Sequence, residues 1–442
     1  MNRRELLKQG ATMALALSPL SALSAESIPP KSIREKPLPS KRPQGGVRIV
    51  VVGGGWSGLA FAEHIRRYLP QSVVTLVEKR ESFLSCPVSN AWLFDLVDLE
   101  FLSHSYLDGA NTHGYTYLHA EATDLDSRHH ILKTTKGEIG YDYLLFATGI
   151  EYDYDVWCRN NPTLEHRLRT EYPAGFIAGS EHLTLKRKIA NYHGGNFFIT
   201  IPRGNYRCLP APYERACLLA DYIKQNKIKG RVIILDANNR VTIKEEGFLR
   251  VFKERYSKEL LYISSAEIVS IDLDRKVIET EFEEVEFVDG SFYPNVRAPK
   301  LLERLGLTTQ TPYNRIEANL DVYTNRFKGH DTIFGCGDLR PMGFSKSGNT
   351  AYTEGANVAK IVAKAIAKKP LKWVSPTTFC VSLVSSMPQQ EMTLLSEYTY
   401  GERGETQFKY TSSDEAWDRN GLGKAHAQFS WAGSMYDRMF YL

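Results

Sequence analysis

The sequence has few cysteines and no excess of charge of either sign. Six cysteines in 442 residues do not form a disulfide framework, and none shows the C-x-x-C spacing of a zinc site or the C-x-x-C-H motif of covalent haem. The histidines show no paired metal spacing, so we predict no metal and no haem on this chain. Net charge is +4, which argues against nucleic acid as a partner. The composition suits a globular protein of two or three domains.

The sequence also lacks an apolar run long enough to span a bilayer. The apolar stretch from Ala11 to Leu20 is too short, but with its basic start it predicts a signal peptide over residues 1–25. Arg3 and Arg4 indicate the twin-arginine route, which exports folded proteins to the periplasm. The alternative is an ordinary secretory leader. Residues 26–45, rich in proline and basic residues, are predicted to be a linker.

A dinucleotide-binding motif follows the linker. In "VRIVVVGGGWSGLAFAEHIRRYL" a buried strand leads into Gly53, Gly55 and Gly58 and then a helix. The next strand ends at Glu78, about 20 residues further on, where a carboxylate can accept from ribose hydroxyls. Gly53 allows the turn, Gly55 lets the backbone approach a pyrophosphate, and Gly58 lets helix and strand pack closely. In this strand–helix–strand context the motif is strong.

Two later segments indicate which dinucleotide is bound. "YDYLLFATGIE" is a predicted strand that ends at Ala147 and Gly149, after a hairpin-like region at 121–139. A second strand ends at Gly337 and Asp338, before a long helix. The set resembles the flavoproteins with two dinucleotide domains, in which the aspartate binds FAD. The alternative for Asp338 is a capping or turn residue.

Glycine is scarce where a second phosphate cradle is expected. A strand at 196–201, a helix at 213–224 and a strand at 231–236 have the order of a nucleotide-binding unit. Their connecting turn holds three prolines, Cys208 and one glycine, Gly204. Proline removes N–H donors and fixes φ. We therefore predict that the protein is not a nicotinamide-dependent reductase.

That turn carries a more specific resemblance. "YRCLPAPYERACLLADY" and "SCPVSNAWL" resemble segments of the flavoprotein subunit of flavocytochrome c sulfide dehydrogenase, and the likeness runs from about Val47 to the C-terminus. Sulfide:quinone oxidoreductase is a more distant relative. The resemblance implies an α/β fold with two Rossmann-like dinucleotide-binding-type domains and a small C-terminal α+β domain. The expected parts are an FAD-binding domain (46–160 and 290–370), a degenerate second domain (161–289) and a flavin-side domain (371–442).

The resemblance also implies chemistry. Cys86 maps to a cysteine joined to the flavin by a thioether, and Cys208 to one half of a redox disulfide that hydrosulfide attacks. The family's second redox cysteine is expected beside Asp338, where this chain has Leu339 and Arg340. Cys336 is the nearest candidate.

Other residues near the expected disulfide are weaker candidates. Cys217 is a weaker partner for Cys208. Arg340 is either a fixed positive charge near the flavin or a surface salt-bridge residue. The position of Glu214 in the first turn of the predicted helix is explained by the helix dipole, which favours a negative charge there. The alternative is that Glu214 relays a proton to the thiol.

We therefore expect a periplasmic FAD-dependent dehydrogenase subunit that oxidises sulfide or a related sulfur compound. It is expected to pass electrons to a c-type cytochrome on another subunit. One alternative is a cytochrome-linked flavin dehydrogenase for a different small substrate. Another is a flavin electron-transfer partner without its own substrate.

Overall fold

The computed structural model describes residues 46–341, 343–401, 406–418 and 427–442. The predicted signal peptide and linker lie outside these residues. The first sheet is parallel, with strand order β21-β9-β1-β2-β5. Its strands are β1 (Arg48–Val52), β2 (Val73–Glu78), β5 (Thr116–His119), β9 (Tyr143–Phe146) and β21 (Ile333–Gly335). The central strands are mostly apolar and buried, as expected where helices and loops cover both faces of a parallel sheet.

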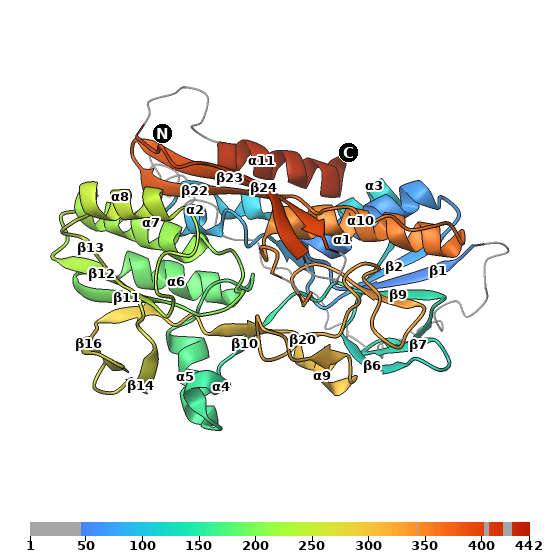
Figure 1. The fold of residues 1–442 in the computed structure, drawn as a ribbon, viewed down its shortest axis with the longest axis horizontal. Helices are drawn as coiled ribbons and strands as arrows, with labels where there is room; N and C mark the ends of the chain where they lie inside the picture. The colour runs from blue at the N-terminus through green and yellow to red at the C-terminus, as the bar shows by residue number, and fades with distance from the viewer. Residues whose placement is uncertain (1–45, 342, 402–405, 419–426) are drawn as a thin grey trace, which may run out of the picture. The chain divides into compact units, whose positions relative to one another are not determined.

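Two long helices pack together over this sheet (Figure 1). They are α1 (Trp56–Tyr68) and α10 (Gly348–Ile366). A Cβ added to Gly355 of α10 would lie 2.3 Å from the Ser57 carbonyl oxygen, so only glycine permits this approach. Strand β21 and helix α10 come late in the chain, so the first sheet is built from two separate stretches of sequence.

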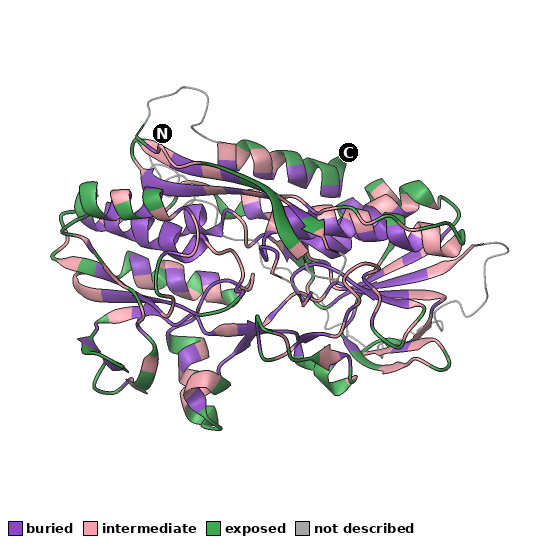
Figure 2. Ribbon diagram, in the orientation of Figure 1, coloured by how far each residue is buried: buried purple, intermediate pink, exposed green. Residues whose placement is uncertain are grey.

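The second sheet contains the predicted strand–helix–strand unit. Its order is β13-β12-β11-β17, all parallel. The predicted elements are present as β11 (Gly195–Ile201), α7 (Ala211–Gln225) and β12 (Gly230–Asp236). Strands β13 (Leu260–Ile263) and β17 (Asp289–Ser291) complete the sheet, and α8 (Glu245–Glu254) packs beside α7. The two central strands, β11 and β12, are mostly buried (Figure 2).

The C-terminal part is an antiparallel sheet with one helix. Strands β22 (Thr378–Ser386), β23 (Gln389–Tyr400) and β24 (Thr406–Asp414) pair in that order. Helix α11 (Ala427–Tyr436) and the short π-helix η2 (Asp437–Tyr441) follow. Strand β22 packs against both α7 and α10, so this part contacts elements of both dinucleotide-type folds (Figure 1).

Smaller elements connect these parts. The hairpin-like region predicted at 121–139 is a three-stranded meander. A separate antiparallel pair is formed by β10 (Glu151–Asp153), which follows β9 of the first sheet, and β18 (Asn295–Arg297), which follows β17 of the second. The remaining elements are β3 (Ser82–Leu84), α2 (Ser89–Leu93), η1 (Leu99–Leu102), β4 (Ser103–Ser105), α3 (Tyr106–His113), β6 (Ala122–Asp126), β7 (Ile131–Thr134), β8 (Gly137–Gly140), β10 (Glu151–Asp153), α4 (Asp155–Cys158), α5 (Pro162–Glu171), α6 (Ser180–Ala190), β14 (Ile268–Asp272), β15 (Val277–Thr280), β16 (Glu284–Glu286), β18 (Asn295–Arg297), α9 (Lys300–Arg304), β19 (Thr308–Thr309) and β20 (Glu317–Ala318).

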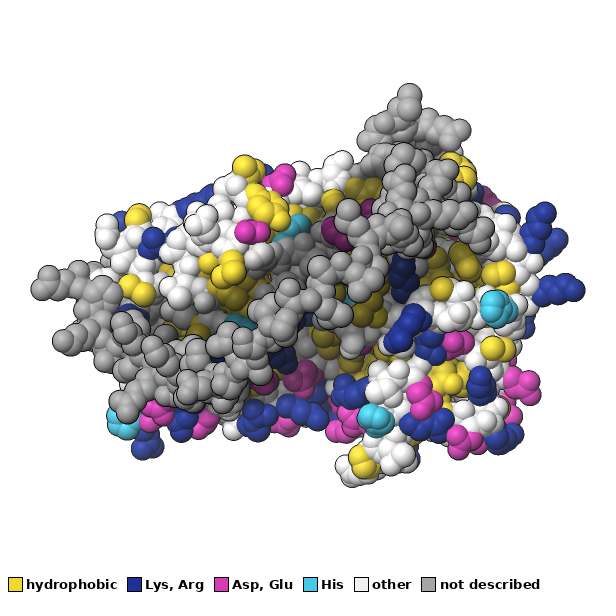
Figure 3. Space-filling view, turned by 180° about the vertical axis from the view of Figure 1, so that it is seen from behind, with side chains coloured by type: hydrophobic (Ala, Val, Ile, Leu, Met, Phe, Trp, Pro, Cys, Tyr) yellow, Lys and Arg dark blue, Asp and Glu magenta, His cyan; other side chains and the backbone are white. Residues whose placement is uncertain are grey.

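The surface reflects the near balance of charge in the sequence. Basic and acidic side chains alternate along the lower edge of the rear face (Figure 3), as 55 basic and 51 acidic residues predict. None of the helices within the described residues is both long and apolar enough to cross a membrane.

Candidate active site

A cavity of about 600 Å³ lies where the two dinucleotide-type folds and the C-terminal part meet. This volume is within the range of small-molecule and cofactor sites, roughly 300–1,000 Å³. Its wall includes the glycine loop after β1, the start of α10, the loop before α7, strand β22 and helix α11. The carboxyl ends of parallel strands are where open α/β sheets bind ligands.

The glycine loop has the geometry that its spacing predicts. Gly53 has a φ of +106°, in the region that favours glycine. A Cβ on Gly58 would lie 1.9 Å from the Gly53 carbonyl oxygen, so helix and turn are in direct contact. A Cβ on Gly55 would meet nothing within 4 Å, and Gly55 lines the cavity. The backbone at Gly55 is therefore open to a phosphate at the N-terminus of α1.

Glu78 lies at the end of β2 and lines the cavity. Its carboxylate accepts hydrogen bonds from the Gly54 N–H at 2.6 Å and from Arg80 Nε at 2.9 Å. Burial opposes ionisation, but the charge and hydrogen bonds of Arg80 outweigh it and lower the pKa of Glu78. The sequence analysis did not select Arg80, because no motif distinguishes it from other arginines near a strand end.

A second set of predicted residues completes this side of the cavity. Ala147, Gly149 and Asp338 line it, and Gly337 has a φ of +79°. Asp338 Oδ2 accepts from Arg207 Nε at 2.7 Å. Asp338 Oδ1 and Thr148 Oγ1 are buried without a hydrogen-bond partner among the described residues. Two unpartnered polar atoms in one cavity wall indicate that a polar ligand completes their bonding.

Three cysteines line the same cavity: Cys86, Cys208 and Cys380. Cys208 lies just before α7 in a left-handed conformation, φ 56°, and its N–H donates to the Lys346 carbonyl at 2.7 Å. Burial raises the pKa of Cys208, and the neighbouring Cys380 raises it further. Both thiols are free in this structure. Cys380, on β22, is therefore one of two cysteines, with Cys86, that the fold brings to the same cavity as Cys208, and the sequence analysis did not select it as a partner.

The predicted partner of Cys208, Cys336, is placed differently. Cys336 is fully buried and is absent from the described residues that line the cavity. Burial raises its pKa strongly. Cys217 is likewise buried, within α7. The strand that ends at Gly335 turns the Cys336 side chain into the core, so nearness in sequence to Asp338 did not bring it to the cavity.

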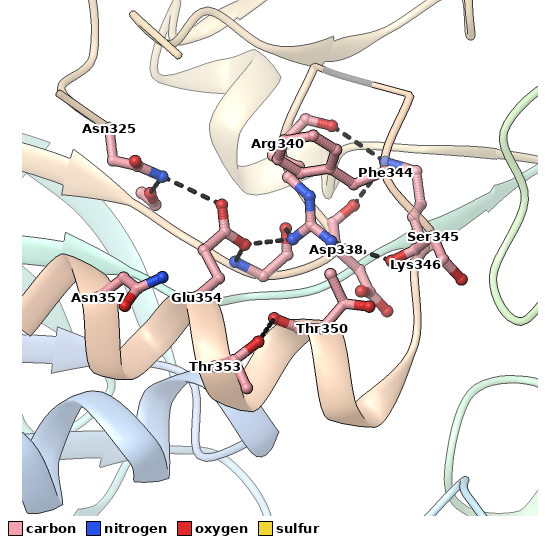
Figure 4. Close-up of polar contacts among 12 residues, drawn as sticks. Asn325, Asp338, Arg340, Phe344, Ser345, Lys346, Thr350, Thr353, Glu354 and Asn357 are labelled. Atoms are coloured by element: carbon pink, nitrogen blue, oxygen red, sulfur yellow. Dashed lines mark hydrogen bonds and ion pairs between the residues drawn. The ribbon is translucent and has the colours of Figure 1, made fainter. Parts of the chain in front are cut away.

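Arg340 is also buried rather than at the surface, which excludes the surface salt-bridge interpretation. Its guanidinium pairs with Glu354 of α10 and donates to the Gly337 carbonyl at 2.9 Å and to the Ser345 carbonyl at 3.0 Å (Figure 4). Arg340 is absent from the described residues that line the cavity. Its observed contacts hold the loop between β21 and α10, which carries Asp338.

Glu214 lines the cavity beside Cys208. Its carboxylate accepts from Asn90 Nδ2 at 2.8 Å, from the Leu383 N–H at 2.9 Å and from Gln428 Nε2 at 3.0 Å. Burial raises its pKa despite these donors. Glu214 therefore links α2, α7, the C-terminal sheet and α11, a role that the helix dipole alone did not predict.

The cavity also has an aromatic wall from the C-terminal part. Trp431 of α11 lines it and stacks on Trp56 of α1, with ring centroids 5.4 Å apart. Cys86 Sγ lies 3.4 Å from the Phe176 carbonyl, and Cys86 faces the cavity from the loop before α2. Residues from distant parts of the chain thus surround one space.

Two family models match the chain. One, "Sulfide dehydrogenase [flavocytochrome c] flavoprotein chain, central", matches residues 183–289, and the other, "Pyridine nucleotide-disulphide oxidoreductase", matches residues 47–158. The first covers most of the second sheet, and the second covers the glycine loop and Cys86. Together with the two parallel sheets, they define an FAD-dependent oxidoreductase of the pyridine nucleotide-disulfide oxidoreductase type.

Individual relatives give the narrower family. A flavoprotein chain of sulfide dehydrogenase [flavocytochrome c] from Chlorobaculum thiosulfatiphilum is 49% identical over 47 residues, 11% of this chain and 98% of that sequence. A mitochondrial sulfide:quinone oxidoreductase from Dictyostelium discoideum is 25% identical over 229 residues, 50% of this chain and 49% of that protein. The chain thus spans about half of that relative. It belongs to the sulfide dehydrogenase and sulfide:quinone oxidoreductase family of flavoproteins.

A solved structure shows the same fold. The sulfide:quinone oxidoreductase from Aquifex aeolicus aligns with a TM-score of 0.70 at 16% identity, over 89% of this chain and 92% of that chain. The predicted α/β class is confirmed.

FAD is the cofactor expected for this family, and the cavity fits it. Gly55 leaves space beside the N-terminus of α1, and Glu78 presents a carboxylate to the cavity. Asp338 Oδ1 and Thr148 Oγ1 have no hydrogen-bond partner among the described residues, so a bound cofactor could provide one. The N-terminus of α10 also faces the cavity, where the helix dipole favours negative charge.

Proposed function

We propose that the protein is a periplasmic FAD-dependent dehydrogenase subunit that oxidises sulfide or a related sulfur compound at Cys208 and Cys380 and passes electrons to a c-type cytochrome. The observation that carries the proposal is the presence of both cysteines in the wall of the cavity that fits FAD. After burial, Cys380 is the neighbour with the largest effect on the pKa of Cys208, which it raises.

The chemistry begins from the disulfide form of this pair. Hydrosulfide attacks one sulfur, so a new S–S bond forms and the Cys208–Cys380 bond breaks. One cysteine then carries a persulfide, whose outer sulfur comes from hydrosulfide, and the other is a thiolate. A second hydrosulfide removes the outer sulfur as hydrogen disulfide, which leaves both cysteines of the pair reduced. Glu214, in the cavity wall, can hold the proton released when hydrogen sulfide ionises. FAD, when bound, supplies the two-electron acceptor for the reduced pair.

The electron acceptor is proposed from the relatives. The family model that matches residues 183–289 and the Chlorobaculum chain are both named for flavocytochrome c, which favours a c-type cytochrome. Relatives named sulfide:quinone oxidoreductase make a quinone the second candidate. Rapid oxidation of the sulfide-reduced protein by a c-type cytochrome, and not by a soluble quinone, would support the first.

The first experiment is an anaerobic titration of the purified, flavin-loaded protein with sulfide, followed by flavin absorbance with dithionite as control. We expect prompt bleaching by sulfide, lost in Cys208→Ser and Cys380→Ser. Cys336→Ser is the matched control and should bleach normally. Bleaching by dithionite but not by sulfide would reject the sulfide proposal and favour a different substrate, or a partner with no substrate.

The proposed location needs its own test. Arg3 and Arg4 lie outside the described residues, and their paired arrangement is the basis of the proposal. Replacing both with lysine should leave the protein in the cytoplasm, as measured by cell fractionation. Unchanged export would indicate an ordinary secretory leader.

A further inference from the structure

Lys244 is a buried cation behind the cysteine pair. It immediately precedes helix α8, has a left-handed backbone with φ 52° and is 4% exposed. Its ammonium donates to Ser382 Oγ at 3.0 Å, to the Met392 carbonyl at 3.0 Å and to the Cys380 carbonyl at 3.3 Å. Lys244 is thereby fixed against strands β22 and β23.

All three acceptors of Lys244 are neutral. Within the described ranges no carboxylate lies within ion-pair distance of it. Another buried lysine, Lys346, has such a partner: its ammonium pairs with Glu317 at 3.0 Å. Burying a charge without a partner is costly. Burial accordingly lowers the pKa of Lys244, while the charges of Cys380, Glu214 and Cys208 oppose this effect. A negative charge that forms beside Lys244 would therefore stabilise its ammonium form.

The charged and titratable groups around Lys244 identify that charge. They are Cys380 on β22, Glu214 on α7, Cys208 before α7, and Glu415 after β24. Glu214 already accepts three hydrogen bonds from other groups, and Glu415 accepts from the Gly247 N–H at 2.7 Å. The cysteines are the groups whose charge changes when the pair is reduced.

Lys244 does not affect the two cysteines equally. After burial, the Lys244 charge has the largest effect on the pKa of Cys380, which Glu214 opposes and hydrogen bonds from Ser347 and Ser345 assist. The pKa of Cys208 is influenced more by Cys380, Glu214 and Cys86 than by Lys244. The geometry agrees with this difference, because the Lys244 ammonium donates to the Cys380 carbonyl and to Ser382 Oγ, two residues further along β22, whereas its hydrogen bonds within the described residues include none to Cys208. A thiolate is therefore favoured at Cys380 over Cys208.

We propose that Lys244 is a positioning residue that makes Cys380 the thiolate released when hydrosulfide attacks Cys208. This inference rests on the proposed function. In the step, the bond from hydrosulfide to Cys208 Sγ forms and the Cys208–Cys380 bond breaks. Both electrons of the broken bond stay on Cys380 Sγ, and the persulfide is carried by Cys208.

The test measures the Cys380 thiolate without sulfide. In a Cys208→Ser background Cys380 has no disulfide partner, and its alkylation by iodoacetamide is followed by peptide mass spectrometry across pH. Adding Lys244→Met should raise the pH midpoint by at least one unit, which slows alkylation at neutral pH at least tenfold. Lys244→Gln should have the same effect as Lys244→Met, whereas Lys244→Arg should retain most of the alkylation rate. Lys253→Met, on the exposed side of α8, is the matched control.

The outcomes separate charge from packing. Loosened packing would expose Cys380 and speed its alkylation, which is opposite to the charge effect. Equal rates in the Met, Gln and parent proteins would overturn the proposal, and so would faster alkylation in Met and Gln. A persulfide found on Cys380 rather than Cys208 after one equivalent of sulfide would also overturn it. Normal bleaching by sulfide with no effect of Lys244 would reject this inference alone, whereas no bleaching of the parent protein would reject the proposed function.

Discussion

Replacing Arg340 with methionine should destabilise the fold and release FAD. Arg340 is fully buried, and its partner Glu354 also accepts from the Gly337 N–H at 2.8 Å and from Asn325 Nδ2 at 3.1 Å (Figure 4). The substitution keeps most of the side-chain volume but leaves the Glu354 carboxylate buried without its cation. The Gly337 backbone, held by both residues, precedes the cavity residue Asp338 and should shift.

The magnitude follows from the burial of the pair. Removing one partner of a buried ion pair costs about 3–5 kcal/mol. The exposed pair between Lys409 and Glu397, at 3.3 Å, is the matched control, and Lys409→Met should cost less than about 1 kcal/mol. The measurement is the free energy of unfolding from urea titration, followed by tryptophan fluorescence, with FAD content measured on the same samples.

The effect should depend on pH. Burial raises the pKa of Glu354, which Arg340 opposes, so Arg340→Met should raise it further. A carboxyl with a raised pKa in the folded state stabilises at low pH and loses that contribution as pH rises through the folded pKa. The destabilisation should therefore be smaller at pH 5 than at pH 8.

Two results would refute this reasoning. One is a loss of stability no larger than that of the Lys409 control. The other is normal stability with an altered flavin reduction potential, which would restore the prediction that Arg340 provides a fixed charge near the flavin. Arg340→Met combined with Glu354→Gln should recover part of the loss, because the unpaired carboxylate is then absent.

Three further predictions concern other parts of the site. Gly58→Ala should prevent stable folding, because its Cβ would lie 1.9 Å from the Gly53 oxygen. Gly55→Ala has space for its Cβ, so this variant should keep the thermal midpoint of the parent protein but bind FAD more weakly, as measured by calorimetry. Burial raises the pKa of Glu391 to about 7, so wild-type stability should fall relative to Glu391→Gln between about pH 4.5 and 7; a constant difference in thermal midpoint would contradict this. If Cys86 is joined to FAD, acid-denatured protein should retain flavin on the Cys86 peptide by mass spectrometry, and Cys86→Ser should release it all.

The sequence was sufficient for the first dinucleotide-binding unit. The spacing of Gly53, Gly55 and Gly58 depends on local backbone geometry, so a turn and a helix N-terminus could be predicted without distant contacts. The position of Glu78 at the end of the second strand could be predicted from the length of one strand–helix–strand unit. The strand and helix around Cys208 were also predictable, because their apolar patterns are local.

The proposed partner of Cys208 depends on tertiary structure. Nearness to Asp338 in sequence favoured Cys336, but the end of β21 turns that side chain into the core. Cys380 reaches the cavity because β22 packs against α7, a contact between segments about 170 residues apart in the chain. Lys244 and Arg340 show the same limit of sequence analysis. The sequence alone does not distinguish a charged residue at the surface from one buried in the core. The chain itself thus determined which local units form, while packing between them determined which thiols, charges and carboxylates share one cavity.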